Sequence, residues 1–511
     1  MSSSPRWCNW VTCSRVTMDN LQSLTYFAPE WGLIATVVVV LLVDLIRNRR
    51  DDRQVGTWFV AGLIVTALLL LGNTPDHTLS LFRDAVAWDP FSHFFKEIVL
   101  LSSLFVAVVV LNSRELDGYP LGEFYMLLGI MILGMFWMVT SIDLLMAYLA
   151  IEIVSLTSFV LAGYLKRSRR SNESALKYVI YGAFSSGLML FGFSYLFGLT
   201  GTTKFHAVAA ALRNLDPSAY GAVVVASILI LAGFGYKISA VPFHFWTPDV
   251  YEGAPTAVTA YLSVAPKAAG FALIIRFFHD VLAVPTGEGL AWSSIGNLPW
   301  PQLLAILSVV TMTLGNLVAL RQTSVKRMLA YSSIAHAGYM LMALPVLSQD
   351  GVFAILLYLV MYLLMNLGAF FVVIVVENRI ASEQFEDYRG LGWKMPYLGV
   401  LMTLFMFSLT GLPPTAGFIG KFYLFAAVIK AGSAYYWLAL VGVINSVISL
   451  YYYLRVVKMM YLKGDPQETL EGAGRFYRSV LTLLALPTLL LGLYWAPVAE
   501  WVRQSLLLFK P

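Results

Sequence analysis

Residues 229–246 read LILAGFGYKISAVPFHFW, and residues 257–277 read AVTAYLSVAPKAAGFALIIRF. Each apolar stretch carries one lysine with a proline nearby: Lys237 precedes Pro242, and Lys267 directly follows Pro266. A lysine in the centre of a bilayer is energetically expensive and usually faces a protein interior or a wet cavity on an ion route. Proline frees backbone groups that only protein or water can satisfy at that depth. Together the two stretches indicate a membrane protein that moves charge.

The composition excludes several classes of protein. With 59% hydrophobic and 12% charged residues, the chain is expected to be a polytopic membrane protein. Cys8 and Cys13 lie near the N-terminus, where they cannot build a disulfide framework or a cysteine-ligated metal or iron–sulfur site. The histidines have no ligand spacing, and neither strand patterns nor a glycine-rich phosphate loop occur. Because the net charge of +5 lies mostly in loops, it gives no argument for nucleic acid. Redox chemistry is expected only on partner subunits.

Apolar runs recur along the chain at intervals that suit membrane-spanning helices. At roughly 20 residues per crossing they predict about fourteen helices, and therefore an all-α polytopic fold. The runs centre on Val39, Leu63, Phe105, Leu133, Val154, Leu190, Ile228, Ala268, Ser308, Ala337, Val360, the stretch 396–429, Val447 and Leu484. Residues 221–249 and 396–429 exceed one straight span and contain proline and glycine, so helices seven and twelve are expected to be broken.

Basic residues gather in the loops that follow odd-numbered helices. These loops hold Arg47, Arg49, Arg50, Arg53, Lys166, Arg167, Arg169, Arg170, Arg321, Lys326, Arg327, Arg379, Arg389, Lys394, Lys463, Arg475 and Arg478. The other loops carry little more than Arg83, Lys204, Arg213 and Lys430. The positive-inside rule then predicts that both termini lie outside and the basic loops in the cytoplasm.

The chain divides into five predicted segments. Residues 1–17 are a polar N-terminal extension, and Met18 is expected to be the true start. Residues 18–115 hold helices one to three, and residues 470–511 hold helix fourteen and the C-terminus. Between them, 116–282 (helices four to eight) and 296–463 (helices nine to thirteen) are expected to form two repeats that pair the broken helices. Because five is odd, the repeats would be inverted in the membrane.

Glu152 is the acidic candidate in the membrane. It lies nine residues after Asp143, about 13.5 Å along the helix and close to mid-depth of the ~30 Å core. Asp143 points to the other side of the helix and is expected to be a capping or interfacial residue. Lys237 is the most plausible partner of Glu152, and coupled groups of this kind titrate together. A pair that only fixes helix packing remains the alternative.

Further lysines and histidines complete the candidate set. Lys267 lies near mid-depth, although snorkelling to an interface is the alternative for such a lysine. Lys421 follows the second break, where it would mirror the first repeat, and Lys177 lies nearer the cytoplasmic end, where it could be only a topology charge. His244 and His336 could relay protons near neutral pH or simply pack. The charged residues near helix ends are expected to lie at the membrane interface; they are Lys96, Glu97 and Glu123.

Two motifs carry a family resemblance. The run KISAVPFHFWTPDVYEGAPT (237–256) and the run GLPPTAGFIGK (411–421) resemble the antiporter-like membrane subunits of respiratory complex I, the proton-pumping NADH–quinone oxidoreductase. The similarity covers nearly all of the chain after Met18. Within the family the chain is most similar to the subunit N group. It stops soon after the fourteenth helix, and it has a lysine, Lys421, where subunit M has glutamate.

The resemblance implies a function and a set of partners. It implies that Glu152 pairs with Lys237, that Lys267 is the central relay, and that Lys421 leads towards the far side. The chain would bind no cofactor, because flavin and iron–sulfur clusters would lie on partner subunits, and NADH and quinone would be substrates of the complex. Its partners would be membrane-arm and peripheral-arm subunits and the lipid bilayer, with no nucleic acid.

Two rival functions remain open at this stage. One is a subunit of an Mrp-type sodium/proton antiporter, which shares this fold. The other is a structural subunit whose buried charges only hold helices together.

Overall fold

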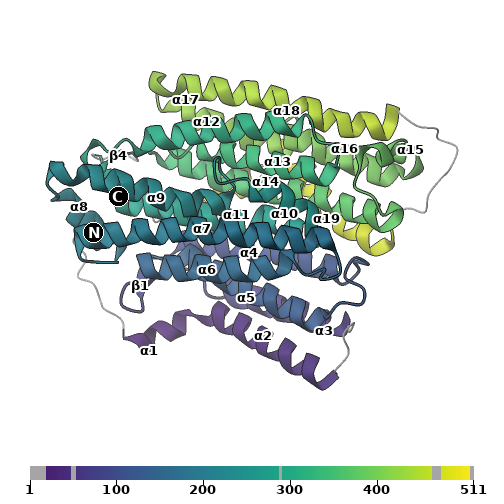
Figure 1. Cartoon of the computed structure of the whole chain (residues 1–511), viewed down its shortest axis with the longest axis horizontal. Helices are drawn as coiled ribbons and strands as arrows, with labels where there is room; N and C mark the ends of the chain where they lie inside the picture. The colour runs from purple at the N-terminus through teal and green to yellow at the C-terminus, as the bar shows by residue number, and fades with distance from the viewer. Residues whose placement is uncertain (1–18, 48–52, 287–290, 463–472, 507–511) are drawn as a thin grey trace, which may run out of the picture.

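The computed structural model describes residues 19–47, 53–286, 291–462 and 473–506. The predictions for residues 1–17 fall outside these ranges. Within them the fold is a bundle of α-helices that lie side by side, with α2 at one edge and α17 and α18 at the opposite edge (Figure 1). The all-α polytopic prediction is confirmed.

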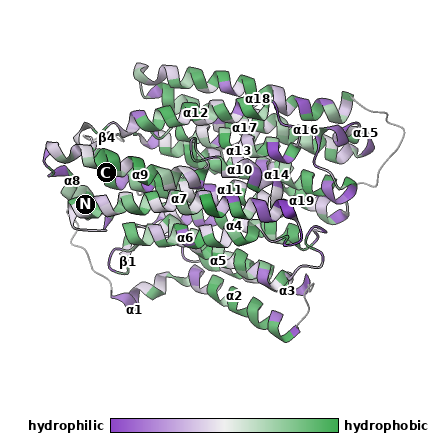
Figure 2. Ribbon diagram, in the orientation of Figure 1, coloured by the Kyte–Doolittle hydropathy of each residue, from purple (hydrophilic) through white to green (hydrophobic). Residues whose placement is uncertain are grey.

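Twelve helices in the described ranges are long and apolar enough to cross a membrane. They are α2 (Ala28–Arg47), α3 (Arg53–Leu71), α4 (Pro90–Val110), α5 (Leu121–Thr140), α6 (Leu144–Ala162), α7 (Arg169–Thr200), α9 (Tyr220–Ile238), α11 (Thr256–Leu282), α12 (Trp300–Ala319), α14 (Gln349–Ile380), α18 (Tyr436–Leu462) and α19 (Arg475–Leu493). The shorter α13 (Val325–Leu341) and the pair α16 (Pro396–Thr410) and α17 (Ala416–Lys430) occupy the remaining predicted runs. Each predicted apolar run therefore falls on a helix. Apolar residues cover the helix lengths, and hydrophilic ones gather towards the ends and loops (Figure 2).

The remaining elements are short and connect or flank the long helices. The short α-helices are α1 (Asn20–Ser23), α8 (Phe205–Arg213), α10 (Trp246–Gly253), α15 (Leu391–Lys394) and α20 (Ala496–Gln504). The 3₁₀ turns are η1 (Leu24–Tyr26), η2 (Pro217–Ala219), η3 (Ile295–Asn297), η4 (Phe385–Tyr388) and η5 (Ser433–Tyr435). Two antiparallel ribbons, β1 (Leu79–Leu81) with β2 (Val86–Trp88) and β3 (Ala283–Pro285) with β4 (Trp292–Ser294), lie in loops. The sequence showed no strand pattern, because strands of three residues are too short to produce one.

Helices seven and twelve are broken as predicted. The first break separates α9 from α10, and Ser239 after α9 adopts the left-handed conformation with φ 65°. The second separates α16 from α17, and Gly411 after α16 adopts the same conformation with φ 89°. A left-handed residue ends a helix because it turns the chain away from the next helical hydrogen bond. Pro266, by contrast, lies inside α11, which continues through it without a break.

The core consists of α11 and α14, which contact each other and are buried along their whole apolar length. α4, α5 and α9 pack against α11, whereas α16, α17 and α19 pack against α14. A helix that is apolar all round must be surrounded by protein or lipid, and here protein surrounds both. The two helices therefore provide the most water-excluded positions in the bundle.

Two buried ion pairs join helices far apart in the sequence. Lys96 Nζ lies 2.5 Å from Glu30 Oε1, and both side chains are buried. The prediction that Lys96 is an interface charge is wrong, because Glu30 of α2, 66 residues earlier, supplies its counter-charge inside the bundle. Arg276 of α11 pairs with Asp89 at 2.9 Å, with both side chains fully buried. Asp89 also caps α4 by accepting a hydrogen bond from the Ser92 amide at 2.7 Å.

We expect Arg276→Met to lower the thermal unfolding midpoint of the solubilised protein markedly. It leaves Asp89 charged and unpaired in the interior, which typically costs ~3–5 kcal/mol. Asp89→Asn, which keeps a capping oxygen, should recover part of the loss when combined with Arg276→Met. The control is Arg213→Met at the exposed end of α8. An equal midpoint in the Arg276 and Arg213 variants would show that the buried pair contributes nothing.

Candidate functional site

Lys237 lies in the last turn of α9, where the break brings the chain to an end inside the bundle. Its side chain is 3% exposed, and Nζ donates a hydrogen bond to Ser155 Oγ of α6 at 3.1 Å. The carbonyl end of a helix carries a partial negative charge, so the end of α9 favours an ammonium group. The broken helix therefore provides a buried position that suits a cation.

Glu152 lies near Lys237 without touching it. It is three residues before Ser155 on the same helix, and its Oε1 is buried with no hydrogen-bond partner among the described residues. The carboxylate is close enough to act electrostatically on the Lys237 ammonium. The structure thus brings the predicted partners together, but it places the Ser155 hydroxyl, rather than a direct ion pair, on the lysine. Asp143 caps α6 as predicted, accepting from the amides of Leu145 and Met146.

Lys267 lies at the centre of α11 and is 1% exposed. Its Nζ donates to the Ser333 carbonyl at 3.1 Å and to Ser333 Oγ at 2.8 Å, both on α13. It also lies 5.8 Å from the centre of the Tyr251 ring of α10. Described residues offer Lys267 no carboxylate partner. The amine is therefore held only by neutral oxygen acceptors and an aromatic face.

Lys237 of α9 packs against α11 close to Lys267. A side chain at Gly270, three residues after Lys267 on α11, would lie 3.6 Å from Lys237 Cγ. The missing side chain lets α9 approach α11 at this point. The stem of Lys237 therefore packs within one turn of Lys267.

His336 lies on α13 among tyrosines and is 1% exposed. Its Nε2 is 3.0 Å from the Tyr453 hydroxyl of α18, and its Nδ1 is hydrogen-bonded to the Tyr358 hydroxyl of α14. Lys267 and Lys421 both act on it electrostatically. The imidazole can accept on one nitrogen while donating on the other, so it can connect two hydroxyls.

Lys421 follows the second break and is 3% exposed. Its Nζ donates to the carbonyl of Thr410, the last residue of α16, at 2.7 Å, and to Ser446 Oγ of α18 at 3.0 Å. It also lies 4.6 Å from the centre of the Tyr339 ring of α13. As at the first break, an ammonium group occupies the carbonyl end of a half-helix.

Five of these side chains lie in the interior on α6, α9, α11, α13 and α17. We call Glu152, Lys237, Lys267, His336 and Lys421 the central line. Apart from Glu152, which is partly buried, its members are at most 3% exposed. Hydroxyl groups, which can both donate and accept hydrogen bonds, contact Lys237, Lys267, His336 and Lys421. Such a series can move protons between neighbouring groups without opening the bundle to bulk water.

Two predicted residues lie apart from the central line. Lys177 Nζ is 2.6 Å from Asp249 Oδ2 and 2.8 Å from Glu173 Oε1, and its side chain is 39% exposed. Asp249 also pairs with Arg327 at 2.7 Å, so Lys177 belongs to a partly exposed ion cluster at the end of the bundle. His244 lies in the first break, buried against the Phe245 ring, and its Nδ1 has no hydrogen-bond partner among the described residues.

Sequence reasoning missed the polar side chains that link the charges. They are Ser155, Tyr251, Ser333, Tyr339, Tyr358, Tyr362 and Tyr453. Single tyrosines and serines are common in membrane helices and carry no signal alone. The spacing of Tyr358, Tyr362 and Asn366 along α14 places them on one helix face, and that pattern could have indicated a polar stripe.

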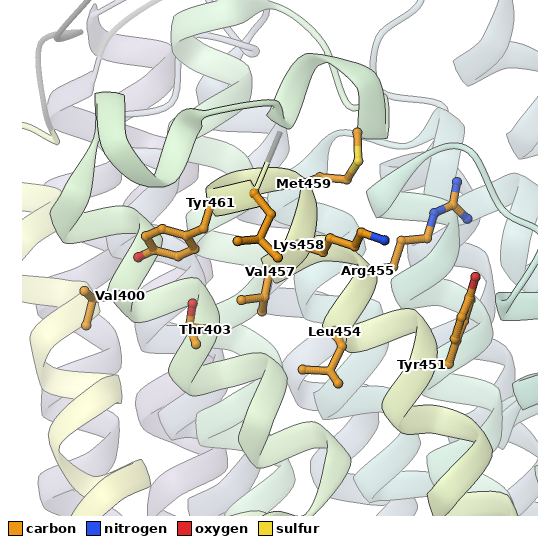
Figure 3. Close-up of a pocket in the computed structure, with 10 residues that line it drawn as sticks. Val400, Thr403, Tyr451, Leu454, Arg455, Val457, Lys458, Met459 and Tyr461 are labelled. Carbon is orange, nitrogen blue, oxygen red and sulfur yellow. The ribbon is translucent and has the colours of Figure 1, made fainter. Parts of the chain in front are cut away.

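One groove lies elsewhere, on the outer face between α16 and α18 (Figure 3). It has a volume of about 860 Å³, and Val400, Tyr451 and Leu454 line it together with Arg455 and Lys458. None of its lining residues belongs to the central line. In the described part of the chain no group of three or more metal-ligating side chains comes together.

Comparison with known proteins gives one consistent result. Residues 141–449 match the sequence profile of the family described as NADH:quinone oxidoreductase/Mrp antiporter, transmembrane. The chain is 44% identical to NADH-quinone oxidoreductase subunit N from Anaeromyxobacter sp., over 96% of this chain and 98% of the relative. It also superposes on a chain of respiratory complex I from Thermus thermophilus, solved with bound aureothin. That match has a TM-score of 0.76 and 31% identity, and it covers 92% of this chain and 98% of that one.

A second solved structure shares only the fold. A chain of the Mrp complex from Dietzia sp. matches with a TM-score of 0.78 and 24% identity, over 93% of this chain and 51% of that chain. Both motifs that carry the resemblance, 237–256 and 411–421, lie inside the matched range. The chain belongs to the NADH:quinone oxidoreductase/Mrp antiporter transmembrane family and, within it, to subunit N of NADH-quinone oxidoreductase.

Proposed function

We propose that this chain translocates protons across the membrane as a membrane-arm subunit of an NADH–quinone oxidoreductase. Electron transfer from NADH to quinone on partner subunits provides the driving force. The observation that carries the proposal is the central line of amines, buried in a chain that matches subunit N over nearly its full length. The ordinary alternatives for isolated buried lysines, snorkelling or pairing, do not fit Lys267, which is deeply buried and lacks a carboxylate among the described residues.

The central line works by passing charge from group to group. A change of charge outside the chain alters the interaction of Glu152 with Lys237. Because neighbouring titrating groups are coupled, the altered charge on Lys237 changes the proton affinity of Lys267. Lys267 then gives its proton past Ser333 to His336. The Tyr339 ring lies 5.9 Å from the imidazole and 4.6 Å from Lys421 Nζ, and it marks the way from His336 to Lys421. Lys177 and His244 stand beside this route, at the ion cluster and in the first break.

The partners follow from this assignment. Flavin and iron–sulfur clusters belong to peripheral-arm subunits, NADH and quinone are substrates of the whole complex, and this chain contributes no redox centre. Neighbouring membrane-arm subunits and the lipid bilayer cover its outer faces. It lies in the bacterial inner membrane, and the distribution of basic loops puts both termini on the periplasmic side.

We also propose that helices four to eight and nine to thirteen form two inverted repeats, with segment boundaries at 116–282 and 296–463. The neighbours of corresponding helices support the pairing: α5 packs on α6 and α11, as α12 packs on α13 and α18. Both breaks begin at a left-handed residue next to a buried lysine, Ser239 near Lys237 and Gly411 against the Lys421 side chain. An inverted pair of this kind places the two breaks at mid-membrane on either side of Lys267.

Purification of the tagged chain in mild detergent tests the assignment. We expect it to recover a complex that contains flavin and iron–sulfur absorbance and oxidises NADH with quinone. A set of membrane subunits without flavin, active in sodium/proton exchange, would favour the Mrp-type alternative instead. That alternative rests on a likeness of fold.

A further inference from the structure

Two carboxyl groups meet at the beginning of α11. Glu115, in the loop between α4 and α5, accepts a hydrogen bond from the Thr256 amide at 2.7 Å. Glu377, near the end of α14, accepts one from the Thr256 hydroxyl at 2.6 Å. Thr256 is the first residue of the helix that carries Lys267. The central line uses neither carboxylate.

The surroundings of Glu115 suit proton exchange near neutral pH. Burial raises its pKa to about 7, and the nearby Glu377 and Glu383 carboxylates add to this effect. The Lys326 ammonium and the Thr256 amide oppose the increase. Lys326 is itself 2% exposed and donates to the Ala254 carbonyl at 2.9 Å. Near neutral pH Glu115 therefore exchanges between its protonated and its ionised form. Proton-transfer groups work best with a pKa close to the working pH.

A polar face connects this site with Lys267. Thr256, Thr259, Ser263 and Lys267 follow one another on α11 at intervals of three, four and four residues, which places them on one side of the helix. Lys267 lies eleven residues, or about 16 Å, from Thr256 along the axis. We call these four residues the polar face of α11. Its two threonines and one serine are all buried.

α14 lines the same path from the opposite side. Asn366 Nδ2 donates to Ser263 Oγ at 2.6 Å, while Asn366 Oδ1 is buried and has no hydrogen-bond partner among the described residues. The hydroxyls of Tyr251 and Tyr362 are buried and face Ser333, which accepts a hydrogen bond from Lys267. Buried polar groups in this state are commonly satisfied by internal water. Hydroxyls and water together can carry a proton from one end of the path to the other.

We infer that Glu115 loads protons at the end of the bundle that bears the basic loops, with Glu377 beside it on Thr256, and that the polar face of α11 carries them to Lys267. This inference rests on the proposed function, because it supplies the central line from one side of the membrane. In each step a protonated carboxyl gives its proton to the hydroxyl and water path, and the neutral Lys267 amine accepts one from it.

The test uses inverted membrane vesicles that contain the whole complex, in which the basic end faces the medium. For Glu115→Gln we expect NADH-driven proton uptake, followed by a pH-sensitive dye, to fall roughly tenfold at pH 6.5. This loss is smaller than the ~10²–10⁴-fold loss expected for a strictly required group, because Glu377 remains at Thr256. The ratio of native to variant uptake should shrink as the medium pH rises above neutral, since a growing share of Glu115 is then ionised in the native chain. Glu115→Asp should restore part of the rate. Glu123→Gln, an exposed carboxyl on α5 at the same end, is the matched control.

A second variant interrupts the path without touching the carboxyls. Asn366→Leu should slow uptake, whereas Asn378→Leu, further along α14, should not. The Asn366→Leu variant also tests the path if Glu115→Gln fails to assemble. Uptake at the native rate and pH dependence in Glu115→Gln, or at the native rate in Asn366→Leu, would overturn the inference. If Lys267→Met still stops uptake in the same vesicles, only the loading site has failed and the proposed function stands.

Discussion

Lys267→Met is expected to stop NADH-driven proton uptake while leaving the complex assembled. Methionine fills nearly the same volume as lysine in the fully buried centre of α11, so packing changes little. The substitution removes the amine that donates to Ser333. Loss of a positioned proton-transfer group typically lowers a rate by ~10²–10⁴-fold. Uptake is measured with a pH-sensitive dye in inverted vesicles, and assembly by native gel electrophoresis.

Lys267→Arg separates a relay from a scaffold. Arginine keeps the positive charge and can still donate to Ser333, but it does not release its proton at any physiological pH. A relay therefore fails in both variants, whereas a purely structural charge survives as arginine. Native uptake in Lys267→Arg would support the scaffold reading and end the role proposed for this residue.

Lys237→Ala and Glu152→Ala are each expected to lower proton uptake and the coupled quinone reductase rate by roughly tenfold or more, since both groups take part in proton transfer. The two groups interact through the electrostatic field without direct contact. The double variant should consequently lose less than the product of the single losses, as coupled neighbours do.

Asp143→Asn provides the control for this pair. It lies on the same helix as Glu152 but caps the end, and asparagine caps a helix about as well as aspartate. Its uptake should stay near the native value. Full uptake in both Lys237→Ala and Glu152→Ala would contradict the proposed roles.

The sequence predicted the helices well because the property that defines them is local. A run of about 20 apolar residues spans a bilayer wherever it occurs, and a proline or glycine within a longer run marks a break. The burial of Lys237, Lys267 and Lys421 was expected from their positions within such runs. The capping role of Asp143 followed from its place at the start of one.

Long-range partners could not be predicted in the same way. Lys96 pairs with a glutamate of α2, and Arg276 pairs with the residue that caps α4. Nothing near either residue in the sequence identifies these partners. The Ser155 contact of Lys237 was missed for a related reason. The rotation of α6 about its axis, set by packing, decides which side chain reaches the lysine.

The ion cluster around α10 has a mechanical consequence. Asp249 and Glu252 of this short helix are held by Lys177 from α7 and by Arg327 from α13. Ion pairs therefore hold α10 on two sides, and only residues 239–245 separate it from the end of α9. Because these ion pairs are partly exposed, added salt weakens them, whereas the interior contacts of Lys267 are shielded from salt. Added salt is therefore expected to weaken the attachment of α10 before it affects the contacts of Lys267.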